Sequence, residues 1–511
     1  TIIIIGAGLA GLSAALQAAE NGCNVKLVSS LPSERAQSVM AEGGINAALN
    51  TKDENDSPEE HFTDTIKAAC GLADPNAVWG MTQAAPELVH WLLKLGVKFN
   101  MSGYDDVDLR NFGGQKKKRT AFAQSDTGKQ IMTAMIDAVR RKEASGMVER
   151  FSHHSFLTLR LCGNICCGCV IRDEYSQETV ELPGDAVIVA TGGMHGLFGN
   201  TTGSLSNTGE VTAELFRLGV PLANGEMIQY HPTTVKCGGK RMLISEAARG
   251  EGGRLFAMKD GKQWYFMEEK YPELGNLMPR DITAREIWNV SHESEVFLDM
   301  TEISEEIISN KLSGLADDCM TYLHKDIRKE PVSVLPGIHY FMGGILVDEQ
   351  HRTPIQNLYA AGECCAQYHG ANRLGGNSLL GALYGGRVAA KSACEQADVV
   401  DLSCATQIDF PPASQISEIK QLNKVMQETM GVVRNENTLL NGIQTVQALT
   451  GNLPLLGMAV LKSALARKES RGAHWREDYP KSNDDDYLKT TVARFDGKQI
   501  QISFVPVPER R

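Results

Sequence analysis

The chain opens with TIIIIGAGLAG, a run of β-branched residues that ends directly in a glycine-rich turn. Such a run is typical of a strand buried in a parallel sheet, and the pattern LSAALQAAENG that follows is helical. Strand, glycine turn and helix in this order predict a dinucleotide-binding unit, with a pyrophosphate at the helix N-terminus. Gly6 allows the tight turn, Gly8 lets the backbone approach the pyrophosphate, and Gly11 lets the helix pack on the strand.

The second strand of this unit, NVKLVSS, departs from the usual pattern at its end. Many such strands are followed by an acidic residue that binds the adenosine ribose. Ser29 and Ser30 stand in that place, so we expect hydroxyl groups to bind the ribose instead.

Two further strand-and-glycine segments lie far downstream, DAVIVATGG (Asp185–Gly193) and NLYAAGECCA (Asn357–Ala366). Their separation predicts a nucleotide-binding domain that is interrupted and then resumed. We expect an α/β fold, in which a discontinuous Rossmann-like domain carries an inserted α+β capping domain and is followed by a helical domain and a C-terminal arm. The expected parts are 1–221 (nucleotide-binding), 222–338 (cap), 339–395 (nucleotide-binding again), 396–470 (helical) and 471–511 (arm).

Charge and hydropathy narrow the class of protein. The 511 residues carry a net charge of −11, which argues against nucleic acid as the main partner, although a local cationic pocket can still bind an anion. No apolar run approaches the ~20 residues needed to cross a bilayer, and no signal peptide precedes the first strand. The twelve cysteines lack regular spacing, which is typical of a reducing compartment. These features predict a cytoplasmic protein.

Four cysteines lie close together in LRLCGNICCGCVIRDE: Cys162, Cys166, Cys167 and Cys169. The segment predicts two strands around a Gly-Asn turn, and strand alternation places Cys167 and Cys169 on one face. We expect a structural hairpin and no metal site. A metal or redox role is the alternative.

Three later segments place cationic side chains beside Pro or Gly: HPTT (His231–Thr234), PRD (Pro279–Asp281) and HGANRLGGNS (His369–Ser378). Two histidines and two arginines of this kind are suited to holding a small dicarboxylate. Each also has an ordinary structural alternative when taken alone. Arg280 could form a surface ion pair with Asp281, for example, and His231 could be a turn residue.

The order and spacing of many motifs resemble those of the flavoprotein subunit of the fumarate reductase/succinate dehydrogenase family. The shared segments cover nearly the whole chain: GAGLAG, MAEGGINAAL, FGGQ, ATGG, QYHPT, SEAARGEGG, PRD, HYFMGG, AGE, GANRLGGNSL and ESRGAHWREDYP. The resemblance implies an FAD-binding domain and hydride transfer between the flavin and the C2–C3 bond of a four-carbon dicarboxylate. It also implies a subunit of an electron-transport complex of anaerobic respiration.

The resemblance implies that Arg280 donates the proton to the substrate carbon. Glu246 and Arg249 then resupply Arg280, and their spacing of three residues puts them on the same side of a helical turn. Their alternative is a solvated helical pair. The resemblance further implies five substrate-binding residues: Arg373 and His339 at one carboxylate, His231 and Ser245 at the other, and Phe112 over the pocket.

The motifs place the FAD contacts on the glycine turns and on the residues around them. The expected contacts are Gly6, Ala7, Gly8, Leu9, Ala10, Gly11, Ser29, Ser38, Gly43, Gly44, Ala190, Thr191, Gly192, Glu210, Glu363, Arg373, Ser378 and Leu379.

One position departs from many members of the family. They carry a histidine that bonds covalently to the flavin just before the AEGG turn, and in RAQSVMAEGG the matching residue is Gln37. An amide cannot form that bond, so we expect FAD to be held non-covalently. In the family the covalent bond raises the flavin potential and supports succinate oxidation. We therefore expect fumarate reduction, with succinate oxidation as the alternative.

L-aspartate oxidase shares most of these motifs and also lacks the flavin-linking histidine. Aspartate oxidases carry an acidic residue and a histidine in a Glu-Gly-Gly-His-type motif that recognises the substrate ammonium. This chain has NFGGQKKKR, with Phe112 where that acid would be. A buried ammonium without a carboxylate partner is costly, so aspartate oxidase is the less favoured alternative. The run Lys116–Arg119 predicts a solvated loop, with Arg119 packed near the site.

The electron donor is expected to lie outside this chain. No CxxCH haem motif occurs in the sequence, and the resemblance implies that the C-terminal arm helps to dock an iron–sulfur subunit. A membrane subunit that oxidises a quinol would lie beyond it. We expect the chain to reach a membrane only through these partner subunits.

Overall fold

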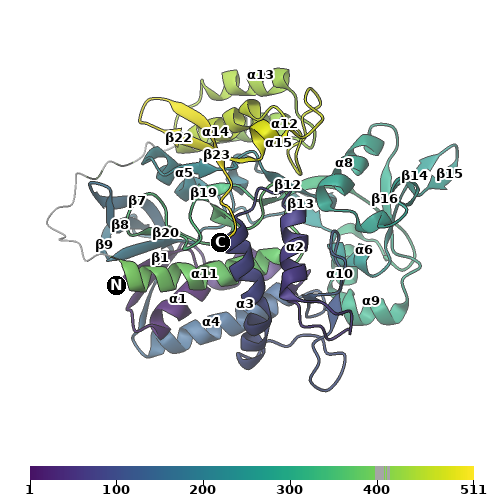
Figure 1. Ribbon diagram of the computed structural model, residues 1–511, viewed down its shortest axis with the longest axis horizontal. Coiled ribbons are helices and arrows are strands. Elements are labelled where there is room, and N and C mark those ends of the chain that lie inside the picture. Colours follow the sequence, from purple (N-terminus) through teal and green to yellow (C-terminus); the bar gives the residue numbers. More distant parts are fainter. Residues whose placement is uncertain (398–407, 409, 411–414) are drawn as a thin grey trace.

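The computed structural model describes residues 1–397, 408, 410 and 415–511. No helix within these ranges is long and apolar enough to span a bilayer. Figure 1 shows an α/β molecule in which the nucleotide-binding layers, the inserted region with α8 and β14, and the C-terminal helices lie side by side.

A five-stranded parallel sheet forms the centre of the nucleotide-binding domain, in the order β20-β10-β1-β2-β6. Strands β10 and β20 come from the two downstream segments that the sequence assigned to this domain. The predicted discontinuous fold is therefore confirmed. The strands are β1 (Ile2–Ile5), β2 (Val25–Ser29), β6 (Val148–Ser152), β10 (Ala186–Val189) and β20 (Leu358–Ala360).

Both faces of this sheet are covered, which explains why its central strands β1 and β10 are continuously apolar. Ile2 and Ile4 pack among helices on one face, whereas Ile3 and Ile5 pack against a hairpin sheet and α5 on the other. The helices are α1 (Leu9–Glu20), α3 (Pro75–Lys94), α4 (Thr127–Ala144) and α11 (Asn377–Gln396). The opposite layer contains β7 (His154–Cys162), β8 (Ile165–Asp173), β9 (Thr179–Pro183) and α5 (Glu210–Arg217).

The inserted region has its own apolar core, in which Leu255, Phe266, Ile287 and Leu298 are fully buried. Two antiparallel sheets and several helices surround it. The sheets contain β12 (Ile228–Cys237), β13 (Lys240–Leu243) and β18 (Leu335–Phe341), and β14 (Arg254–Lys259), β15 (Lys262–Trp264), β16 (Val296–Asp299) and β17 (Val332–Ser333). The helices are α6 (Glu246–Gly250), α7 (Phe266–Lys270), α8 (Arg280–Ser291), α9 (Glu305–Lys311) and α10 (Ser313–Asp318).

A small sheet and one further helix lie in the part of the chain between β2 and α4. The sheet β3 (Ile45–Asn46), β5 (Thr120–Ala121) and β4 (Leu109–Arg110) follows the AEGG turn. Helix α2 (Pro58–Ala68) begins after Ser57, whose hydroxyl accepts a hydrogen bond from the Glu60 amide and caps the helix.

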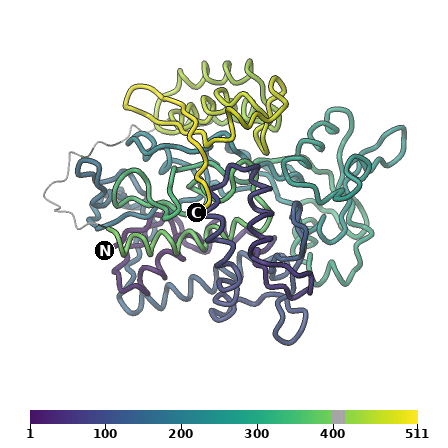
Figure 2. The backbone as a smooth tube through the Cα atoms, in the orientation of Figure 1, coloured from purple at the N-terminus to yellow at the C-terminus, as the bar shows by residue number. Residues whose placement is uncertain are grey.

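The described C-terminal part contains four helices, α12 (Ile416–Thr429), α13 (Glu436–Val446), α14 (Asn452–Ala466) and the short α15 (Asp484–Tyr487). It ends in a hairpin of β22 (Lys489–Phe495) and β23 (Ile500–Pro506). The strand expected in QIQISFVPV is β23. Its partner β22 continues into a sheet with β11 (Leu222–Ala223), β19 (Gly344–Leu346) and β21 (Cys365–Ala366). Figure 2 shows the end of the chain returning to the middle of the molecule, where the Arg511 amide donates to Asn76 at the start of α3. The exact boundaries of the five parts stay predictions.

Candidate active site

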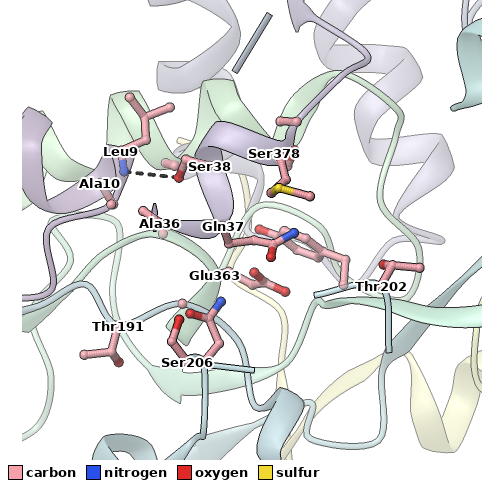
Figure 3. A pocket seen from close by; sticks show the side chains of 18 of the residues that line it. Leu9, Ala10, Ala36, Gln37, Ser38, Thr191, Thr202, Ser206, Glu363 and Ser378 are labelled. Carbon is pink, nitrogen blue, oxygen red and sulfur yellow. Dashed lines mark hydrogen bonds between the residues drawn. The ribbon is translucent and has the colours of Figure 1, made fainter. Parts of the chain in front are cut away.

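A cavity of about 620 Å³ runs from the β1–α1 turn to the inserted region. Figure 3 shows side chains from distant segments, among them Gln37, Thr202, Glu363 and Ser378, around this space. The predicted site residues that line it are Gly6, Ala7, Gly8, Leu9, Ala10, Ser29, Ser38, Gly43, Gly44, Phe112, Ala190, Thr191, Gly192, Glu210, His231, Ser245, Glu246, Arg280, His339, Glu363, Arg373, Ser378 and Leu379. Two other predicted site residues, Gly11 and Arg249, do not line the cavity.

The glycine turn at one end of the cavity is sterically fixed at two positions. Gly6 has a φ of +110°, and a Cβ there would lie 2.2 Å from the carbonyl oxygen of Ala190. A Cβ on Gly11 would lie 1.8 Å from the carbonyl oxygen of Gly6, so Gly11 sets the close approach of α1 to the turn. This supports its predicted packing role and explains why Gly11 does not face the cavity.

The residues at this end fit a dinucleotide. Leu9 and Ala10, in the first turn of α1, line the cavity, where the free backbone N–H groups of a helix N-terminus attract a phosphate. The Leu9 amide donates to Ser38 Oγ at 3.2 Å. At the end of β2, the hydroxyl of Ser29 is buried and has no hydrogen-bond partner among the described residues. That hydroxyl is free to bind a ligand, as the Ser29 prediction requires.

The other end of the cavity is built around Arg280 and Glu246. Arg280 is the first residue of α8, directly after Pro279, and its Nε and Nη2 both donate to Glu246 Oε2, at 2.8 and 2.6 Å. Both side chains are buried. The alternative of a surface pair between Arg280 and Asp281 is therefore wrong, because Arg280 is buried and pairs with Glu246.

Glu246 also connects to Arg249 across one turn of α6. Arg249 Nη2 lies 3.6 Å from Glu246 Oε1, and both side chains are buried. The alternative of a solvated pair is therefore wrong. Burial raises the pKa of Glu246, but Arg280 and Arg249 outweigh that effect and lower it overall. Glu246 is consequently an ionised carboxylate between two guanidinium groups. The helix that carries it is capped by Ser245, whose Oγ accepts from the Ala247 amide at 3.3 Å.

Two neutral histidines face the same space from adjacent strands. His231 on β12 and His339 on β18 have ring centroids 5.1 Å apart. Burial, followed by the positive charge of Arg280, holds the pKa of each well below its usual value. His339 Nδ1 lies 2.7 Å from Thr202 Oγ1, which fixes the ring. Both rings can therefore bind a ligand oxygen without carrying charge themselves.

Arg373 is a buried cation whose charge the protein compensates only in part. Burial and the repulsion of Arg280 lower its pKa to about 9, although Tyr340, Glu363 and Glu246 pull in the opposite direction. Its Nε is buried and has no hydrogen-bond partner within the described parts of the chain. The guanidinium lies 4.3 Å from the centroid of the Tyr340 ring. Such a group is suited to binding an anion.

Gln229 joins the two ends of this arginine cluster, and the sequence interpretation did not assign it a role. Its Oε1 accepts from Arg280 Nη1 at 3.1 Å, while its Nε2 donates to the Arg373 carbonyl at 2.8 Å and to Asn372 Oδ1 at 3.1 Å. Gln229 is fully buried. Its position two residues before His231 could have indicated this role, because side chains two residues apart in a strand lie on the same face.

Gln37 lies on the cavity wall next to Ser38. Its Oε1 accepts a hydrogen bond from the Ser204 amide, so its side chain is anchored to the loop that also supplies Thr202. The side chain of Gln37 therefore faces the space that a bound ligand would occupy.

Other predicted groups lie away from the cavity. Arg119 is buried and pairs with Asp56 and Asp64 at 2.8 and 3.0 Å, whereas Lys116 and Lys118 are exposed. The cysteine cluster lies in the expected hairpin, β7 and β8. Throughout the described ranges, no group of three or more His, Cys, Asp or Glu side chains could hold a metal ion.

Comparison with known proteins gives a consistent result. Residues 1–379 match the model of the FAD binding domain family, and residues 449–510 match that of the fumarate reductase flavoprotein C-terminal family. The chain is 38% identical to the succinate dehydrogenase flavoprotein subunit of Bacillus subtilis, over 100% of this chain and 98% of that protein. It is 32% identical to the 8-methylmenaquinol:fumarate reductase flavoprotein subunit of Wolinella succinogenes, over 100% and 92%. A solved structure of E. coli quinol fumarate reductase FrdA superposes with a TM-score of 0.90 at 28% identity, covering 99% and 96% of the two chains.

Proposed function

The chain belongs to the family of succinate dehydrogenase and fumarate reductase flavoprotein subunits, and from this premise we propose that it reduces fumarate to succinate with a non-covalently bound FAD. Members of this family are FAD-dependent oxidoreductases that act on succinate or fumarate. The observation that supports a dicarboxylate as the substrate is the charge at the end of the cavity built around Arg280 and Glu246. Three guanidinium groups, of Arg249, Arg280 and Arg373, lie there near two carboxylates, those of Glu246 and Glu363, which leaves positive charge for a dicarboxylate to neutralise.

FAD is bound by the turn before α1, by Ser29 and by the residues near the N-terminus of α11. When bound, FAD supplies the hydride. The pairs expected from the sequence then hold the substrate: Arg373 with His339 at one carboxylate, and His231 with Ser245 at the other. Fixing both ends orients the double bond, and well-oriented reactants can lower a barrier by several kcal/mol.

Arg280 delivers the proton. A guanidinium is a weak acid in water, but the carbon that accepts the proton carries developing negative charge and is a strong base. The ionised Glu246, held against both Arg280 and Arg249, provides a path that returns a proton to Arg280. Gln229 fixes the free edge of the Arg280 guanidinium, so the group faces the substrate in one orientation.

The direction of the reaction is argued from Gln37. In the family, covalent attachment of the flavin raises its potential, and Gln37 cannot form that bond. A fall of about 30 mV changes the free energy of a two-electron transfer by roughly 1.4 kcal/mol, in favour of fumarate reduction. Succinate oxidation is the second candidate, because the relative at 38% identity is a succinate dehydrogenase subunit.

Electrons are delivered by a partner. Two relatives are named as flavoprotein subunits, one of an enzyme that uses 8-methylmenaquinol. We propose an iron–sulfur subunit that docks against the C-terminal arm, and a membrane subunit that oxidises a quinol beyond it.

The test begins with purified protein reduced by dithionite or a viologen dye. Fumarate should reoxidise it, and the rate should exceed that of succinate oxidation with an artificial acceptor. Faster succinate oxidation would overturn the proposed direction. Formation of iminoaspartate and peroxide from L-aspartate and oxygen would show instead that the enzyme is an aspartate oxidase.

A further inference from the structure

Two cysteines that are distant in sequence meet at the far ends of α1 and α11. The sulfur atoms of Cys23 and Cys394 lie 2.8 Å apart, although 371 positions separate the residues. Cys23 follows α1 just before β2, and Cys394 lies in the last turn of α11. A disulfide bond is about 2.05 Å long, so a shift of roughly 0.8 Å would join them. We propose that Cys23 and Cys394 are a covalent modification site that forms a reversible disulfide.

The backbone already holds the two thiols together. Helices α1 and α11 pack along one another, as Figure 1 shows below the central sheet. The Ser13 hydroxyl donates to the Leu383 carbonyl at 2.6 Å, and a Cβ on Gly386 would lie 2.3 Å from the Ala10 carbonyl oxygen. These close contacts fix the relative position of the helices, so the disulfide can form without moving either one far.

Exposure distinguishes this pair from other cysteines of the chain. Cys23 and Cys394 are both partly exposed, whereas Cys166, Cys364 and Cys365 are buried. An oxidant in solution can therefore reach the pair.

The chemistry requires a two-electron oxidant, and we name hydrogen peroxide. Both sulfurs of the pair are partly exposed, so peroxide can reach either one, and the steps are the same whichever is oxidised first. An S–O bond forms on Cys23 as the O–O bond breaks and water leaves, giving a sulfenic acid. The Cys394 sulfur then displaces the oxygen as a second water, and the S–S bond forms. Two thiols lose two electrons and two protons in all, and a dithiol reductant reverses the change.

The two helices that the disulfide would join both begin at the cavity. Leu9 and Ala10 at the start of α1, and Ser378 and Leu379 at the start of α11, all line the nucleotide end of the cavity. A bond at the opposite ends makes the pair of helices one unit. A cross-link that closes so long a loop also restricts the unfolded chain strongly. The oxidised protein should resist unfolding, and it should release its cofactor at a higher temperature.

The experiment treats the FAD-loaded protein with hydrogen peroxide under native conditions and digests it without reduction. Mass spectrometry should find a peptide that links Cys23 to Cys394. Thermal unfolding should shift upward by several degrees and return to its starting value after dithiothreitol. Cys23→Ser should abolish both the cross-link and the shift. Cys70→Ser, at another partly exposed cysteine, should retain both.

Three results would overturn the proposal. They are two free thiols after a peroxide treatment that oxidises other cysteines, irreversible oxidation of Cys23 with Cys394 intact, and a cross-link that forms only after urea has unfolded the chain. The mass-spectrometric result on the unmodified protein stands even if a serine variant folds poorly.

Discussion

Arg280 places two of its guanidinium nitrogens on one oxygen of Glu246, at 2.8 and 2.6 Å. The other oxygen of Glu246 accepts from the Gly113 amide at 2.9 Å and lies 3.6 Å from Arg249. The carboxylate is thus fixed on both sides, and Arg280 cannot turn away from the cavity without taking both of these hydrogen bonds from the buried Oε2 of Glu246. This arrangement is what a positioned proton donor requires.

Replacement of Arg280 tests that assignment. Arg280→Ala should leave FAD bound. It should lower the rate of fumarate reduction by ~10²–10⁴-fold, which is the usual contribution of a positioned acid. Arg280→Lys should retain a little activity, because an ammonium can donate a proton but cannot pair with Glu246 and Gln229 together. The measurement is fumarate-dependent oxidation of reduced viologen. Arg285→Ala is the control, since Arg285 lies on the same helix and packs on Trp475 outside the cavity. If Arg280→Ala turned over fumarate as fast as the unmodified protein, Arg280 would not be the proton donor.

Gln229 should affect fumarate reduction because it holds Arg280 and Arg373 in position. Gln229→Leu leaves Arg280 Nη1 and the Arg373 carbonyl without this partner, and each lost buried hydrogen bond costs about 1–3 kcal/mol. We expect kcat/KM for fumarate to fall by roughly 10-fold or more, and the pH profile to change, while FAD content is unaffected.

Gln367→Leu provides the matched control for that experiment. Gln367 is another buried amide, and it donates to the Asp348 carbonyl away from the cavity. Its loss should lower stability without a selective effect on kcat/KM. Equal kinetic effects in the two variants would show that Gln229 acts only through stability.

Local sequence patterns predicted the elements that hold the cavity, but they could not predict its long-range pairings. The strand before GAGLAG and the packing of Gly11 follow from β-branched residues and glycine sterics, which act over a few residues. The hydrogen bonds of Gln229 depend on three segments meeting in space, and no spacing in one segment encodes that. The pairing of the arm strand β22 with β11 was missed for the same reason. The exclusion of Asp281 as the partner of Arg280 also needed the fold, because neighbours in sequence are the natural first candidates.

Replacement of Gln37 tests how FAD is held. Acid precipitation of the unmodified protein should release all of the flavin into the supernatant, because an amide cannot bond to it. Gln37→His supplies the residue that forms the link in other family members, so part of the flavin should remain in the acid pellet and the flavin potential should rise. The measurements are absorbance of the two fractions and a redox titration. Yellow colour in the pellet of the unmodified protein would contradict non-covalent binding.

The pH dependence of substrate binding should report Arg373. Burial and Arg280 lower the pKa of this group to about 9, so it is cationic below that pH and loses its charge as the pH rises through it. The KM for fumarate should therefore be constant near neutrality and rise above about pH 9, by up to about tenfold per pH unit. The rate at saturating fumarate should change less, because a bound dicarboxylate favours the cation. Arg373→Gln should show a high KM that no longer varies over this range. A flat KM in the unmodified protein up to about pH 10, or the same rise in Arg373→Gln, would assign the alkaline limit to another group.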